Sequence, residues 1–260
     1  MDRRKFLAAG GAALAGSIAG CSTPSGRKSV AGIAAPAVPT SLLQQEGWEK
    51  VDELSQKVFS TEILGLYSVT GYSHTLIYED ARLRRKLHQG TLGAFDATVM
   101  SFFATHVEMN PDIDELPIGR AKVISQTKKQ ATDRLVQRMN AQGLRNVHRV
   151  GTRTLTVDTG QQADVTEYLA QYHFPSMTVP LRDGRSITIE SGTIDVRGML
   201  AIWQNDRFIV VSGGAYPAEN FREQIRKKLT DLVSVSITID LELEPRNYKQ
   251  ELENLVTAVK

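Results

Sequence analysis

The sequence predicts an α+β domain, in which an antiparallel β-sheet is flanked by helices. Apolar and polar residues alternate along several stretches of the second half of the chain, as they do in strands that bury one face. Short polar sequences at residues 158–161 and 204–206 separate neighbouring stretches, which is typical of hairpins. Residues 128–144 instead carry apolar side chains at helical spacing. Hairpins with a few helices between them favour an antiparallel sheet that helices cover on at least one face.

The strands are predicted from a period-two pattern of apolar residues. Residues 96–109 are expected to form a long strand with one buried face. Gly192 and Gly198 lie within residues 186–203 and predict bulges there, because glycine in a strand weakens regular pairing. Residues 46–58 fit either a short helix or an edge strand. The other predicted strands are residues 69–78, 150–157, 163–174, 207–212 and 233–243.

Helices are predicted where apolar residues recur every three or four positions. Residues 128–144 have such a stripe, and Gly143 suits the position after a helix C-terminus. Residues 79–88 predict a charged helical turn, and residues 248–259 predict a short amphipathic helix at the end of the chain. Residues 218–229 predict a further helix, because their large apolar residues have a spacing of four. These are Phe221, Ile225 and Leu229.

The first 21 residues combine two features of exported proteins. Arg3 and Arg4 precede a run rich in Gly and Ala, residues 6–19, which is shorter than the ~20 residues of a membrane-spanning helix. Small residues then lead to Cys21, the single cysteine of the chain. The arginine pair resembles a twin-arginine export signal, and residues 18–21 resemble a lipobox. The pattern predicts a cleaved signal peptide and a lipid attached to Cys21.

The chain is expected to have four parts. Residues 1–21 form the signal peptide, and residues 22–41, rich in Ser, Pro, Gly and Ala, form a disordered tether. Residues 42–244 form the α+β domain, and residues 245–260 form a C-terminal helix. A single cysteine that carries lipid cannot form an intrachain disulfide, so the fold must depend on its packed core.

Composition supports a packed globular domain, since 41% of residues are hydrophobic and 23% are charged. Removal of residues 1–20 takes away three of the 31 Lys and Arg and one of the 29 Asp and Glu, which leaves a formally neutral mature chain. A neutral chain gives no electrostatic reason for binding a polyanion, and we expect no nucleic-acid partner.

Candidate metal sites are weak in this sequence. The five histidines never have the spacing of a zinc motif, and the nearest approach is His106 with Glu108, two residues apart on a predicted strand. Residues 110–115 place oxygen donors at alternate positions, as calcium loops do. They lack the glycine at position six and the glutamate at position twelve, where Ala121 stands. We therefore expect no metal and no cofactor.

Two other segments have a functional and a structural interpretation. Residues 212–214, Ser-Gly-Gly, precede the predicted helix 218–229, where backbone amides could face an anion, but strand termination and turn geometry explain these glycines better. The basic residues 82–88 could touch anionic lipid headgroups, although a solvated helix face is the simpler interpretation. No G-x-S-x-G motif occurs, and no catalytic residue is predicted.

Two resemblances to known families extend these expectations. The order of helix, hairpin, hairpin and helix across residues 128–229 resembles the photosystem extrinsic-subunit (PsbP-like) sandwich. A haloarchaeal family of twin-arginine-exported lipoproteins of unknown function is similar over most of the chain. The segments that carry this second resemblance are the leader, Gly47-Trp48, residues 78–87, Phe102-Phe103-Ala104, Asp158-Thr159-Gly160 and residues 210–217.

These features favour a membrane-anchored lipoprotein of the cell envelope. Its α+β domain is expected to be non-enzymatic, to lie on the extracytoplasmic face of the cell membrane, and to bind an unknown protein or small-molecule ligand. The expected partners are the twin-arginine translocase during export and the membrane, through the lipid on Cys21. Two alternatives remain, which are an exported hydrolase or cofactor-binding protein, and a structural envelope component.

Overall fold

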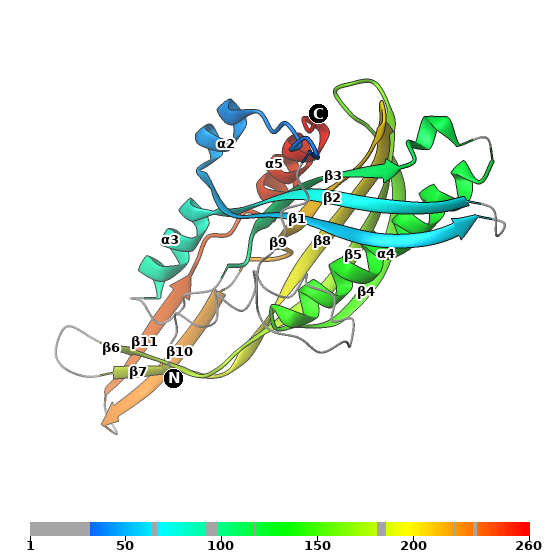
Figure 1. The fold of residues 1–260 in the computed structure, drawn as a ribbon. Coiled ribbons are helices and arrows are strands. Elements are labelled where there is room, and N and C mark those ends of the chain that lie inside the picture. Colours follow the sequence, from blue (N-terminus) through cyan, green and yellow to red (C-terminus); the bar gives the residue numbers. More distant parts are fainter. Residues whose placement is uncertain are drawn as a thin grey trace, which may run out of the picture.

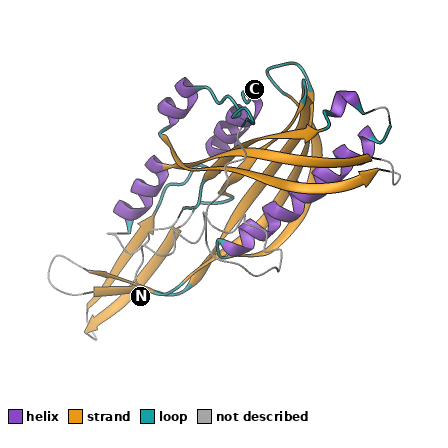
Figure 2. Cartoon of the chain, viewed as in Figure 1, coloured by secondary structure: helices purple, strands orange, loops and turns teal. Residues whose placement is uncertain are grey.

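A seven-stranded antiparallel sheet forms the body of the protein, with strand order β1-β2-β3-β9-β8-β5-β4 (Figure 1). The computed structural model describes residues 32–260 except 64–66, 92–97, 117, 181–185, 221 and 231–232. The seven strands are β1 (Trp48–Ile63), β2 (Tyr67–Asp80), β3 (Ser101–Asn110), β4 (Leu144–Thr156), β5 (Gln162–Phe174), β8 (Gly192–Asn205) and β9 (Phe208–Pro217). Helices flank this sheet, which confirms the predicted α+β class (Figure 2).

Two smaller hairpins lie outside the large sheet. Strand β6 (Met177–Pro180) pairs with β7 (Ser186–Ile189), and β10 (Arg222–Thr230) pairs with β11 (Val233–Asp240). Both hairpins project from one end of the molecule (Figures 1 and 2).

The large sheet separates two hydrophobic cores. On one face, α5 (Pro245–Thr257) packs its buried side chains Leu252 and Leu255 against Phe102 of β3. Helices α2 (Thr40–Glu46) and α3 (Ala81–Gly90) contribute Leu43, Leu83 and Leu87 to the same core. Burial of each such side chain contributes about 1.5–3 kcal/mol to folding, which makes these helices part of the domain.

The second core lies beneath α4 (Arg120–Ala141), which runs along the opposite face of the sheet (Figure 1). Its buried residues Val123, Leu135 and Met139 pack against the sheet. The helix begins eight residues before the predicted 128–144, because Gly119, with a φ of +84°, turns the chain into it. Gly143 follows the helix with a φ of +89°, which confirms its predicted role.

Most of the predicted strands are confirmed. Residues 46–58 lie mainly in β1, an edge strand that pairs with β2. The strands predicted at 150–157 and 163–174 form the β4–β5 hairpin, and those at 186–203 and 207–212 lie largely in β7, β8 and β9. The predicted charged turn at residues 79–88 is largely α3.

Strand β3 differs from the prediction that residues 96–109 bury one face. Its side chains are buried on both faces, with Ala104 in the core beneath α5 and Val107 in the core beneath α4. The strand starts at Ser101, and residues 96 and 97 lie outside the described residues. A strand at the middle of a sheet that is covered on both sides has no solvent-facing row, which is why simple alternation underestimated its burial.

The predicted helix at residues 218–229 is wrong. Residues 222–230 form strand β10, whose backbone pairs in antiparallel register with β11, so that Ile225 lies opposite Ile237. Phe221, one of the residues that suggested the helix, lies outside the described residues. The spacing of four was local, whereas pairing with a strand rich in β-branched residues is a tertiary interaction that overrides it.

Glycines 213 and 214 correct another prediction, because they lie inside β9 and do not end it. A Cβ atom added at Gly213 would lie 2.0 Å from the Met199 carbonyl oxygen of β8, and one at Gly214 would lie 2.0 Å from the Ser101 carbonyl oxygen of β3. These glycines therefore allow close approach of β9 to both neighbouring strands.

The break predicted near Gly192 is confirmed, since β7 ends at Ile189 and β8 starts at Gly192, but neither Gly192 nor Gly198 forms a bulge. Gly192 is the first residue of β8, and the pairing of β8 with β5 and β9 passes through Gly198 in regular register. A Cβ atom at Gly198 would lie 3.2 Å from Met139 Cε of α4. The glycine thus makes room for the helix.

The predicted terminal helix is confirmed as α5, whereas the described end of the predicted tether is bound to the domain. Within the predicted tether 22–41, the Ala37 amide donates to the Lys260 carbonyl at 2.7 Å, and the Lys260 amide donates back to Ala37 at 3.0 Å. This part of the segment is attached to the domain, and helix α2 starts at Thr40. The C-terminal segment 245–260 is integral to the core through α5. Residues 22–31 lie outside the described residues.

In the described part of the chain, no helix has both the length and the apolar character needed to cross a membrane.

Substitution of Gly213 by Ala should destabilise the protein by about 3 kcal/mol or more, because the new methyl group would clash with a backbone carbonyl that cannot rotate away. Gly151→Ala is the matched control, since a Cβ there meets only Glu167 Oε2, at 3.8 Å. Urea unfolding of both variants measures the difference. Equal stability of the two variants would contradict the proposed close approach of β8 and β9.

Candidate functional site

The residues predicted from the sequence as sites of export and lipidation are Arg3, Arg4 and Cys21. All three lie outside the described residues, so the candidate site below comes from the domain itself. None of the residues that line it was identified as a site residue from the sequence.

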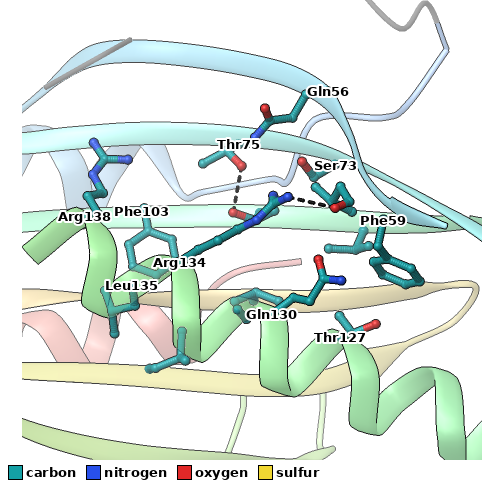
Figure 3. A pocket seen from close by; sticks show the side chains of 16 residues that line it. Gln56, Phe59, Ser73, Thr75, Phe103, Thr127, Gln130, Arg134, Leu135 and Arg138 are labelled. Atoms are coloured by element: carbon teal, nitrogen blue, oxygen red, sulfur yellow. Dashed lines mark hydrogen bonds between the residues drawn. The ribbon is translucent and has the colours of Figure 1, made fainter. Parts of the chain in front are cut away.

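A cavity of about 90 Å³ lies between α4 and the sheet (Figure 3). Its walls come from β1, β2 and β3 on one side and α4 on the other, while one residue each of β8 and β9 completes it. The lining residues are Gln56, Val58, Phe59, Ser73, Thr75, Phe103, Thr105, Val107, Thr127, Gln130, Ala131, Arg134, Leu135, Arg138, Leu200 and Val211.

The cavity has an apolar part that the second core provides. Leu200 and Val211 are buried side chains of the central strands β8 and β9, and Leu135 reaches them from α4. Phe103 of β3 and Phe59 of β1 add aromatic surface. Alternation along the strands explains this lining, because every second residue of β3 and β9 faces α4. This surface can hold a hydrocarbon group out of water.

Buried hydroxyl groups form the polar part of the lining. Thr75 Oγ1 and Thr105 Oγ1 lie 2.9 Å apart on neighbouring strands, so one donates to the other (Figure 3). Each hydroxyl has one hydrogen, and the accepting partner keeps its own hydrogen for a further acceptor. Thr127 Oγ1 already donates to the Val123 carbonyl within α4, at 2.9 Å. The Thr75–Thr105 pair is therefore a potential donor toward the cavity.

Two arginines of α4 bring positive charge to the cavity. Arg134 extends from the helix toward β1, where its Nη2 donates to the Val58 carbonyl oxygen at 2.8 Å (Figure 3). Arg138 lies one turn further along the helix, at a spacing of four, and also lines the cavity. Both side chains are half-buried. A guanidinium has five N–H donors, so the bond to Val58 leaves most of the donors of Arg134 unused.

Burial lowers the pKa of both guanidinium groups below the ordinary arginine value. For Arg134 burial is the whole cause, with no opposing carboxylate. For Arg138 the carboxylates of Asp52 and Glu79 partly oppose it, because their negative charge raises its pKa. Neither arginine lies within ion-pair distance of a carboxylate among the described residues. The cavity lining therefore includes two cations and no acidic side chain among the described residues.

The sequence contains a signal for these arginines that was not used. Salt bridges on a helix join residues three or four positions apart. Around Arg134 these positions hold Gln130, Ala131, Gln137 and Arg138, and none of them is acidic. An arginine pair beside an apolar stripe, with no acid three or four positions away, could have indicated a buried cation site.

A family model described as a domain of unknown function (DUF6517) matches residues 35–260. The chain belongs to the DUF6517 family. The family match starts at residue 35, which agrees with the attachment of residues 33–37 to the domain. No curated protein and no solved structure matches the chain. Membership of an uncharacterised family is thus confirmed, while the haloarchaeal origin, the twin-arginine signal and the PsbP-like sandwich stay predictions.

The histidine pair of this DUF6517 domain has structural contacts. His74 Nδ1 lies 3.1 Å from the Ile33 carbonyl oxygen, and His106 Nδ1 lies 3.1 Å from that of Ala34. The two histidines face each other on β2 and β3 and attach the N-terminal segment to the sheet. Glu108, considered with His106 as a metal ligand, lies 3.9 Å from Arg207. Within the described residues, no three His, Cys, Asp or Glu side chains are grouped closely enough for a metal ion.

The other candidate segments of the sequence also have structural contacts. In the acidic loop 110–115, Asp112 accepts from the Asp114 amide and Asp114 pairs with Arg120 at 2.6 Å. The basic run 82–88 lies in α3, where Lys86 donates to the Glu242 carbonyl at 2.7 Å. Residues 212–214 are followed by strand β10 and not by a helix, which removes the anion site considered there.

Two carboxylates are buried together where β1, α3 and α5 meet. Glu251 of α5 accepts from Trp48 Nε1 at 2.7 Å and from Arg82 Nη2 at 3.3 Å. Asp80 caps α3 by accepting from the amides of Arg82, at 2.8 Å, and Leu83, at 3.0 Å. These bonds join three elements that are distant in sequence, so the cluster fixes α5 to β1 and α3.

Burial is the main cause that raises the pKa of Glu251 to about 7, and the Asp80 carboxylate adds to the shift, while the Trp48 bond opposes it. Burial also raises the pKa of Asp80. A carboxyl group with a raised pKa in the folded state holds its proton more tightly there than in the unfolded chain. Its contribution to stability is therefore present at low pH and is lost as pH rises through about 7.

The variant Glu251→Gln should remove this pH dependence, because a glutamine keeps an acceptor for Trp48 and does not ionise. Between about pH 5 and about pH 8 the wild type should lose roughly 2–3 kcal/mol relative to the variant, at 1.36 kcal/mol per pKa unit. Urea unfolding across this range measures it, with Glu49→Gln, whose side chain is 70% exposed, as the control. A constant difference between wild type and Glu251→Gln would show that Glu251 does not titrate there.

Proposed function

We propose that this protein is a lipoprotein of the cell envelope that binds a small molecule in the cavity beneath α4. The domain is anchored on the extracytoplasmic face of the cell membrane by lipid on Cys21, after export through the twin-arginine translocase. The leader supports the location, and the cavity between α4 and the sheet carries the binding function. A site of about 90 Å³ suits a metabolite-sized molecule, because ordinary drug-sized ligands occupy pockets of about 300 Å³ or more.

The chemistry of the lining supports binding in preference to catalysis. General acid–base catalysis needs a group that exchanges a proton near the working pH, such as His, Asp, Glu or Lys. The described residues around the cavity include none of these types and consist of apolar side chains, hydroxyls, amides and two arginines. Such a set holds and orients a ligand, and it leaves the hydrolase alternative without a proton carrier at this site.

The anchoring part of the proposal predicts a difference between wild type and Cys21→Ser. In a host with the native export pathway, the wild type should fractionate with membranes, and its intact mass should correspond to a chain that starts at a lipid-bearing Cys21. The Cys21→Ser protein should lose the lipid and appear in the soluble extracytoplasmic fraction. Replacement of Arg3 and Arg4 by Lys should leave the precursor in the cytoplasm. A wild type that stays uncleaved in the cytoplasm would contradict the anchoring.

The binding part predicts that filling the cavity blocks it. Ala131 lines the cavity, so Ala131→Leu places three more carbon atoms in it and should raise the thermal midpoint while preventing ligand binding. Ala141→Leu, at an exposed position of the same helix, is the matched control. The probe ligands are butyrate, butanol and butylamine. Their binding is measured by NMR, from changes in the chemical shifts of backbone amides in β2, β3 and α4.

Saturable shifts with at least one probe, lost in Ala131→Leu and kept in Ala141→Leu, are the expected result. If no probe gives shifts in the wild type, the binding proposal fails and the structural envelope component becomes the better hypothesis. That alternative has no saturable ligand.

A further inference from the structure

We propose that the cavity beneath α4 binds small monocarboxylates, with the carboxylate on Arg134 and the hydrocarbon chain on the apolar lining. This inference rests on the proposed binding function and names its ligand class. It follows from three observations in one place, which are an unpaired half-buried cation, a donor pair of hydroxyls, and an apolar surface of limited size.

The state of Arg134 calls for an anion. A charge removed from water needs a partner of opposite charge or a full set of hydrogen bonds, because desolvation is costly. Among the described residues, Arg134 makes one hydrogen bond, to the uncharged Val58 carbonyl oxygen at 2.8 Å. A carboxylate in the cavity would supply the missing negative charge and accept from donors that Val58 leaves free.

Arg138 adds a second positive charge to the cavity and is the secondary contact for the ligand carboxylate. Asp52 and Glu79 act on Arg138 electrostatically and partly compensate it, whereas no carboxylate acts on Arg134 in this way. Arg134 therefore has less compensating negative charge around it than Arg138. An arginine beside a second cation also disfavours ligands that carry a positive charge, so an amine should be rejected.

The hydroxyl pair adds a donor of the required kind. Thr75 and Thr105 share one hydrogen bond of 2.9 Å and leave one hydroxyl hydrogen for the ligand. Both side chains are buried, at 7% and 8% exposure, so a bond to them is shielded from water. A carboxylate accepts from N–H and O–H donors together, whereas an alcohol offers no negative charge to Arg134.

Size and polarity separate carboxylates from other oxyanions. A water molecule takes about 30 Å³ in the liquid, so the cavity of about 90 Å³ has the size of about three waters. Phe103, Leu200 and Val211 would contact the part of the ligand that is not anionic. Inorganic phosphate has no apolar part and presents oxygen on every side. A short-chain carboxylate such as butyrate matches both parts of the lining.

Chain length should therefore control affinity. Each methylene that enters the apolar part should tighten binding about fourfold until the cavity is full. Acetate should bind more weakly than butyrate, and the gain should stop when the chain outgrows the cavity. A polar cavity that recognises only the carboxylate would show no such dependence.

The experiment is calorimetric titration of the full chain carrying Cys21→Ser, which removes the lipid and leaves the domain unchanged. Butyrate is compared with acetate, butanol, butylamine and inorganic phosphate. We expect butyrate to bind at least tenfold more tightly than butanol and butylamine and more tightly than phosphate. Because this comparison uses ligands alone, it does not depend on the folding of any variant.

Variants then assign the contact to Arg134. Arg134→Gln should weaken butyrate binding at least tenfold and should leave butanol binding unchanged, while Arg134→Lys should restore part of it. Arg120→Gln, at the exposed start of the same helix, is the matched control and should bind as the wild type does. The thermal midpoint of ligand-free Arg134→Gln should be unchanged or higher, since an uncompensated charge has been removed.

The outcomes separate this inference from the function on which it rests. Equal affinity for butyrate and butanol, or unchanged butyrate binding in Arg134→Gln, would overturn the carboxylate assignment and leave small-molecule binding intact. Phosphate binding as tight as butyrate would also overturn it, in favour of a general oxyanion site. If none of the compounds binds, both the inference and the proposed function fail.

Discussion

The fold depends on the close approach of β9 to β8 and β3 at the centre of the sheet. Gly213 and Gly214 have no side chain, and a Cβ at either position would meet a carbonyl oxygen of a neighbouring strand at 2.0 Å. This contact joins three central strands that contribute to both hydrophobic cores. It also places Val211 and Leu200 at the back of the cavity, because both lie within three residues of the glycine contact or its partner Met199. The central packing and the candidate site therefore have one structural origin.

The two faces of the sheet differ in how their charged side chains are paired. On the α5 side, Glu251 accepts from Trp48 and Arg82 and Asp80 caps α3, although Trp203 Nε1 in the same core has no hydrogen-bond partner among the described residues. Beneath α4 the polar residues are incompletely paired, since Arg134 has a carbonyl partner and no carboxylate. A satisfied buried network contributes rigidity, whereas an incomplete one beside a cavity is the arrangement expected of a binding site. The cavity beside the uncompensated Arg134 is the reason for placing function on the α4 side.

The sequence predicted the α+β class, most strands of the large sheet and the helix α4, because each depends on local periodicity. The predictions were wrong for elements whose structure depends on contacts between distant parts of the chain. Residues 222–230 form a strand because β11 is available to pair with them. Strand β3 is buried on both faces because it is an interior strand of a sheet covered on both sides. The cavity could not be predicted for the same reason. Arg134 meets Val58 across 76 residues of chain, and the sequence alone showed only that no acid lies three or four positions from Arg134 on the helix.

The geometry of Arg134 also determines how a ligand would act on the domain. Its guanidinium already bridges α4 and β1 through the Val58 carbonyl, so a carboxylate would complete an existing contact without moving the helix. Little conformational entropy is then lost on binding, which favours affinity in a small site. Because the ligand would bind only the folded state, it would stabilise the domain in proportion to the logarithm of its concentration relative to its dissociation constant. The uncompensated charge of Arg134 destabilises the domain when the cavity is empty. With a carboxylate bound, the same charge would strengthen the connection between α4 and the edge of the sheet.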